Sequence, residues 1–107
     1  MKGPFPISGV VSYVMQNSKG AYILSRDGKI AHYIGRSDDD LQGRIQRSST
    51  EGYGYKYFWF EDTTSPKRAY ELECEWYHKY KPTDNSVHPA VPPGTNWRCP
   101  VAGCEWS

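Results

Sequence analysis

An Asp27-Gly28 pair separates two short runs of β-forming residues, and this pattern restricts the possible folds more than any other. The run Gly20–Ser25 (GAYILS) precedes the turn, and the run Ile30–Gly35 (IAHYIG) follows it. Asp-Gly between two such runs is a strong short-range signal of a β-hairpin, because these residues tolerate the backbone angles of tight hairpin turns. The sequence therefore predicts an antiparallel pair of strands at its centre.

A short helix and a third strand are predicted after the hairpin. Asp38-Asp39-Asp40 supplies acidic residues that suit the start of a helix, and Leu41 and Ile45 are four positions apart and share one helical face. The run Tyr55–Phe60 (YKYFWF) has five aromatic residues in six positions. Because both faces of such a strand are apolar, we expect it to lie in the interior of a sheet.

A second helix is predicted to begin at Ser65, as N-cap, with Pro66 at its first position, and to run to about Tyr80. Met1–Pro6 is expected to be a loose lead-in, and 10–15 a short strand. Frequent prolines exclude long regular elements from 86–107, although two tryptophans there indicate that this tail packs back on the domain. We expect one domain over 1–107, with a core at about 10–85.

Composition limits the classes of function. The net charge of +1 gives no strong field toward nucleic acid, so a DNA-binding role requires a local basic patch. No run approaches the roughly 18 apolar residues of a membrane span, and no signal peptide is recognisable. We therefore expect no membrane partner, a cytoplasmic location and reduced cysteines.

Five polar or aromatic positions stand out on these elements. Tyr22 ends a GAY motif on the first predicted strand, and Tyr33 begins a YIG motif on the second, eleven positions later. Arg44 follows after eleven more positions on the first helix, Glu73 lies on the second helix, and Asn85 is twelve positions beyond it. In this order and at this spacing, the chain resembles the GIY-YIG nuclease superfamily from about residue 20 to 85, with GAY in place of GIY.

The resemblance implies an α+β fold, in which a small three-stranded antiparallel sheet is flanked by helices. It also implies a metal-dependent endonuclease that hydrolyses DNA phosphodiester bonds with Mg²⁺ or Mn²⁺. DNA is then the partner, with a possible protein partner that supplies specificity.

The resemblance implies a role for each residue. Tyr22 would be the general base or orient the water, and Tyr33 would hydrogen-bond the water or the phosphate. Arg44 would pair with phosphate oxygens, and Glu73 would hold one divalent metal ion. Asn85 would hydrogen-bond near the scissile phosphate or steady Tyr22. An unperturbed tyrosine pKa of ~10 does not suit neutral pH, so nearby cations must lower it.

Two further arginines are candidates for phosphate or DNA binding. Arg44 is one position further from Tyr33 than is commonest in the family, so Arg47 is the alternative catalytic arginine. Arg36, directly after YIG, is a second possible phosphate contact. Glu73 lies on the packed side of its helix and therefore requires a partner.

A different class of function stays open. Tyrosines on adjacent strands commonly serve packing alone, and an isolated arginine on a helix is commonly solvated. The alternative is therefore a non-catalytic module that keeps the fold and binds nucleic acid or docks a partner.

The cysteines suggest a second metal site. Cys74 and His78 share a helical face, and with Cys99 and Cys104 they offer four tetrahedral zinc positions that would fasten the tail to the helix. His88 is a competing ligand. The alternatives are a buried, apolar Cys74 and two free or disulfide-bonded tail thiols. A zinc-ribbon-like interaction protein is a third hypothesis.

Overall fold

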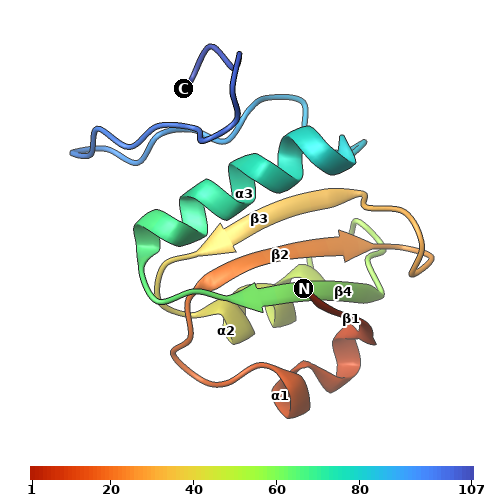
Figure 1. Ribbon diagram of the computed structural model, residues 1–107. Coiled ribbons are helices and arrows are strands. Elements are labelled where there is room, and N and C mark those ends of the chain that lie inside the picture. The colour runs from red at the N-terminus through yellow and green to blue at the C-terminus, as the bar shows by residue number, and fades with distance from the viewer.

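A computed structural model describes all 107 residues as a four-stranded antiparallel sheet with helices on both faces (Figure 1). The strand order is β1-β4-β2-β3. The elements are β1 (Lys2–Pro6), a 3₁₀ turn (Ile7–Gly9), α1 (Val10–Tyr13), β2 (Gly20–Ser25), β3 (Tyr33–Ser37), α2 (Leu41–Ser48), β4 (Tyr57–Asp62) and α3 (Pro66–Tyr80).

The α+β class is confirmed, but the expectation of three strands is wrong. The segment expected to be a loose lead-in is β1, which pairs with β4 through Phe5 and Phe58. Prolines are compatible with this strand because it lies at the sheet edge, where one side of its backbone needs no partner. Residues 10–15, expected to be a strand, contain the single helical turn α1. The core therefore begins before residue 10.

The predicted hairpin is present, but its loop is longer than a two-residue turn. β3 begins at Tyr33 rather than Ile30. The Asp27 carboxylate accepts hydrogen bonds from the backbone N–H groups of Lys29 and Ile30, at 2.9 and 3.0 Å. Because this side chain satisfies backbone groups that would otherwise pair across the hairpin, the loop extends over residues 26–32.

Both long helices begin where their caps predict. Asp40 accepts a hydrogen bond from Gly43 N at 3.0 Å at the start of α2, and Ser65 accepts one from Arg68 N at 3.1 Å at the start of α3. α3 ends at Tyr80, and the following residue, Lys81, adopts a left-handed conformation. The aromatic strand β4 is interior, as expected, although it begins two residues later.

The sheet lies between α3 on one face and α1 with α2 on the other, and the tail lies beyond α3 (Figure 1). Three apolar clusters hold these layers together. The first lies between the sheet and the α1–α2 side and includes Tyr22, Leu41 and Phe58. The second joins β2 and β3 to α3. The third lies where the tail crosses the far side of α3, around Tyr70 and Cys99. None of the helices combines the length and apolar character needed to cross a lipid bilayer.

Candidate functional site

Two adjoining recesses form what we call the tyrosine hollow. Both are lined by Tyr22 of β2, Tyr33 of β3 and Arg44 of α2. The larger recess, of about 540 Å³, continues toward Tyr53 and Tyr55. The smaller recess, of about 210 Å³, is completed by Gly35, Arg36, Asp38 and Glu73. The structure thus brings four of the five residues expected at the active site to one concave surface.

The position of Gly35 in the YIG motif leaves no space for a side chain. Gly35 lies directly opposite Tyr22 in the β2–β3 pair. A Cβ atom at Gly35 would approach the Tyr22 hydroxyl oxygen to 2.5 Å, so only glycine lets this hydroxyl lie across β3. The Tyr22 and Tyr33 rings then pack with centroids 6.3 Å apart. A larger residue at position 35 would displace Tyr22 from the hollow.

Glu73 reaches the hollow from α3 and is only 7% exposed. The partner that such a carboxylate requires is Arg36, whose Nη1 donates to Oε1 at 2.7 Å. Arg36 Nε also lies 3.4 Å from Asp38 Oδ1. Burial raises the pKa of Glu73, while the Arg36 guanidinium acts in the opposite direction. Glu73 Oε2 makes no hydrogen bond and is the oxygen left for another ligand.

Both tyrosine hydroxyls are protonated in the ligand-free protein at neutral pH. Burial raises the pKa of Tyr22 far above its usual value, and the Tyr33 hydroxyl adds to the shift. Burial also raises the pKa of Tyr33. The Arg44 guanidinium acts in the opposite direction on both. Arg44 itself is exposed and forms no ion pair, so its charge is available to an anion.

Two expected residues do not line the hollow. Arg47 lies beside a different polar recess, together with Gln42 and Gln46. The amide of Asn85 bonds the backbone of β3: Oδ1 accepts from Ile34 N at 2.8 Å, and Nδ2 donates to Ile34 O at 3.0 Å. Asn85 therefore fixes the residue next to Tyr33 and does not point toward Tyr22.

The hollow also contains residues that sequence reasoning missed. The Tyr55 hydroxyl donates to Asp84 at 2.5 Å, and Arg26 Nη2 lies 2.7 Å from the same carboxylate. The rings continue as a row, with centroids 6.3 Å apart from Tyr33 to Tyr55 and 6.0 Å from Tyr55 to Tyr53. The aromatic run around Tyr55 was visible in the sequence, but nothing there links Arg26 to a carboxylate 58 positions away.

The donors of the hollow are compatible with one hard divalent cation. Mg²⁺ prefers oxygen ligands and retains several waters, so one or two carboxylate oxygens are sufficient protein ligands. Glu73 Oε2 meets this requirement, and the neighbouring Tyr22 and Tyr33 hydroxyls offer further oxygen atoms as ligands. Arg36 would continue to hold Oε1.

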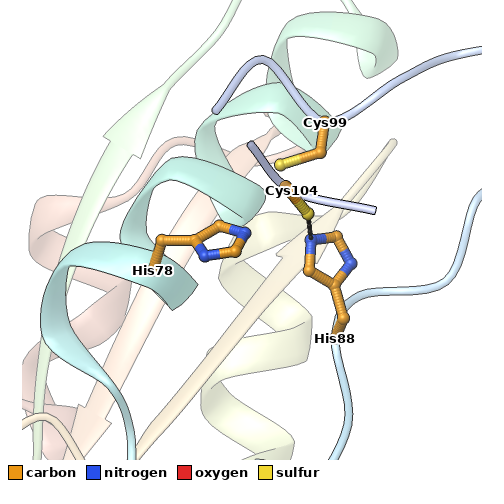
Figure 2. A group of neighbouring side chains, drawn as sticks. All are labelled: His78, His88, Cys99 and Cys104. Atoms are coloured by element: carbon orange, nitrogen blue, oxygen red, sulfur yellow. Dashed lines mark hydrogen bonds between the residues drawn. The ribbon is translucent and has the colours of Figure 1, made fainter. Parts of the chain in front are cut away.

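A second group of side chains, the His–Cys cluster, lies between α3 and the tail (Figure 2). Its members are His78, His88, Cys99 and Cys104, whose ligand atoms all lie within 4.8 Å of one another. This set could hold a metal ion. The group corresponds to the alternative ligand set, in which His88 takes the place of Cys74. Cys74 is fully buried in the apolar cluster around Tyr70, one helical turn before His78.

No family model matches the chain, and no curated protein or solved structure is significantly similar to it. Its function must therefore be inferred from the chemistry of these two sites.

Proposed function

We propose that the protein is a metal-dependent endonuclease of GIY-YIG type that hydrolyses DNA phosphodiester bonds at the tyrosine hollow. The observation that carries the proposal is the convergence of Tyr22, Tyr33, Arg44 and Glu73 from four different elements. Phosphodiester hydrolysis needs a positioned water, a cation for the phosphate and charge stabilisation in the transition state. Each of these requirements has a candidate residue in the hollow.

Arg44 binds the phosphate. Its guanidinium is free of intramolecular ion pairs and can donate two parallel hydrogen bonds to phosphate oxygens. Tyr22 orients the attacking water through a hydroxyl that can lie against Gly35 only because this residue has no side chain. Because burial keeps this hydroxyl protonated, it takes part as a base only when added positive charge lowers its pKa.

Glu73 Oε2 would hold one Mg²⁺ or Mn²⁺ ion, which when bound supplies the positive charge that stabilises the transition state. Arg36 keeps the Glu73 carboxylate oriented through its hydrogen bond to Oε1. Asn85 is a positioning residue, which acts on Tyr33 through the backbone of Ile34.

The row of tyrosine rings supports nucleic acid as the substrate. Tyr53, at the open end of the row, is 61% exposed, and aromatic rings of this kind stack on nucleobases. Arg44 supplies the one unpaired positive charge of the hollow, because Arg26 is paired with Asp84 and Arg36 with Glu73, and the net charge of the chain is only +1. We therefore expect weak, salt-sensitive binding to DNA, with a protein partner supplying specificity.

One observation favours the alternative, a non-catalytic module that binds nucleic acid or docks a partner. The Arg36–Glu73 ion pair balances the charge of the buried carboxylate without a metal ion. If this pair is purely structural, the hollow binds a phosphate backbone and cleaves nothing.

Incubation with supercoiled plasmid and Mg²⁺ or Mn²⁺ distinguishes the two functions. The wild type and a Glu71→Ala control should nick the plasmid, since Glu71 is a partly exposed residue of α3 that pairs only with Arg68. Glu73→Ala should lose nicking and still unfold cooperatively. Plasmid binding without nicking by the wild type, or equal nicking by Glu73→Ala, would contradict the endonuclease proposal.

A further inference from the structure

We infer that His78, His88, Cys99 and Cys104 form a structural zinc site that fastens the tail, residues 86–107, to α3 (Figure 2). This site shares no residue with the tyrosine hollow, so the inference does not depend on nuclease activity.

The chemistry of the four ligands selects zinc among common metal ions. Two thiolate sulfurs and two imidazole nitrogens are a typical tetrahedral zinc set, whereas Mg²⁺ and Ca²⁺ require oxygen. Zinc–ligand bonds of ~2.0–2.3 Å place tetrahedral ligand atoms roughly 3.3–3.8 Å apart. The four donor atoms lie within 4.8 Å of one another, so a contraction of about one ångström completes the site.

His88 is already in the tautomer that a metal requires. Its Nδ1 lies 2.9 Å from the carbonyl oxygen of Pro89, which can only accept, so Nδ1 carries the proton. In a neutral imidazole the lone pair is then on Nε2, and this atom faces Cys104 Sγ at 3.5 Å. A backbone carbonyl that holds the second ring nitrogen is the usual support of a zinc-binding histidine.

His78 supplies an independent observation. Its Nε2 atom is buried and has no hydrogen-bond partner. An unpartnered polar nitrogen in a protein interior is destabilising, because it has lost its hydrogen bonds to water. The other three donor atoms gather around the same ring (Figure 2), and a bound metal ion would satisfy this nitrogen.

The backbone of the tail presents its two sulfurs together. Cys99 N donates to Trp106 O at 2.9 Å, which closes the segment that joins the cysteines into a loop. Trp106 N donates to Cys104 Sγ at 3.4 Å, a bond suited to a thiolate. On zinc binding, each thiol releases one proton to solvent, and two thiolates then balance the ion's charge of +2.

Four protein ligands fill a tetrahedral shell and leave no position for substrate, so the role is structural. The tail needs such support, because it contains no helix or strand and contributes only Cys99 to the fully buried residues of its cluster. Zinc binding would add stability through the folded state alone, by about 4 kcal/mol at a free zinc concentration a thousandfold above Kd.

Metal content of the full-length protein, purified without chelator, tests the inference directly. We expect one zinc ion per chain by mass spectrometry. After removal of zinc, Co²⁺ should give the intense visible absorption of a tetrahedral site with thiolate ligands. Absence of zinc together with absence of this Co²⁺ absorption, or a disulfide between Cys99 and Cys104, would overturn the proposal.

Three variants test the ligand set. His88→Ala should abolish the Co²⁺ spectrum, whereas His88→Cys, which substitutes another zinc ligand, should retain tetrahedral bands. Cys74→Ala should bind Co²⁺ like the wild type. If Cys74→Ala loses the metal as completely as His88→Ala, the assignment of His88 is wrong. Glu73→Ala should keep its zinc whether or not the hollow cleaves DNA, which separates this inference from the proposed nuclease function.

Discussion

The tyrosine hollow and the His–Cys cluster are built in opposite ways. Tyr22 and Tyr33 project from paired strands whose backbone hydrogen bonds fix their register, so their arrangement needs no ion. Three ligands of the cluster, His88 among them, come from a tail that has no regular backbone pairing. A sheet can thus hold reactive groups in place before a ligand arrives, whereas an irregular segment depends on the ion to order it. The two sites should respond differently to substitution and to metal removal.

The largest expected effect comes from removing the Tyr22 hydroxyl, which should impair the tyrosine hollow and leave the His–Cys cluster unchanged. Tyr22→Phe should lower plasmid nicking by about 10²–10⁴-fold, the range typical of removing a general acid or base. The zinc content should stay at one ion per chain, because Tyr22 lines the hollow and does not belong to the His–Cys cluster. Single-turnover nicking rates and metal analysis on the same preparations measure both quantities. Tyr57→Phe, on β4 and outside the hollow, is the matched control.

The two arginines of α2 give the next largest effect. Arg44→Ala should slow nicking by about 10²–10³-fold, comparable to loss of a charge-stabilising donor. Arg47→Ala should change the rate by no more than a few-fold, because Arg47 lies outside the hollow. The measurement is the nicking rate at saturating plasmid for each variant. A larger loss from Arg47→Ala would transfer the phosphate-binding role to that residue.

A substitution in the tail should affect only the cluster. The Trp106 ring stacks on His88 with centroids 5.4 Å apart and planes 5° from parallel. Trp106→Ala should weaken zinc binding by about 10–100-fold, as loss of groups that support a metal ligand does. Competition with a chromophoric chelator gives the affinity, and nicking under saturating zinc should match the wild type. Val87→Ala, at an exposed neighbouring position, should change neither.

The smallest expected effect is a pH dependence confined to the hollow. Burial raises the pKa of Glu73 in the folded protein, so protonation there favours folding. This stability is complete below the unfolded pKa of about 4.3 and is lost as pH rises through the folded value. The unfolding free energy of the wild type relative to Glu73→Gln should therefore fall across this window, by about 1.4 kcal/mol per pKa unit of separation.

Urea titrations at fixed zinc and without Mg²⁺ measure this difference. Zinc release at low pH affects both proteins and cancels in the comparison. A difference that is constant with pH, or that rises, would show that the carboxylate is not held in a desolvating site.

Local sequence signals predicted most of the fold. The caps of α2 and α3 and the aromatic interior strand follow from residues within a few positions of each element. β1 was missed because its prolines normally argue against a strand, and only the pairing with β4 makes an edge strand there. Its residues lie more than fifty positions from their partners, a separation that no local pattern encodes.

In the candidate sites, too, local features could be predicted and contacts between distant segments could not. Tyr22 and Tyr33 were placed by a hairpin, which is a local feature, and they do lie together. Helical spacing pointed to Cys74 as a ligand beside His78, but the approach of the tail selected His88 instead. Likewise, Asn85 was expected near the reacting phosphate, and the path of the chain after α3 brings its amide to the backbone of β3.

The contact of Asn85 with Ile34 also affects how the protein associates with itself. β3 is an edge strand, and the outward N–H and C=O groups of such a strand can pair with another chain and seed aggregation. Asn85 occupies both groups of Ile34, and Asp84 N bonds the carbonyl of His32 at 2.7 Å. The segment after α3 thus shields this border of the sheet from intermolecular pairing, and Asn85→Ala should leave it open to self-association.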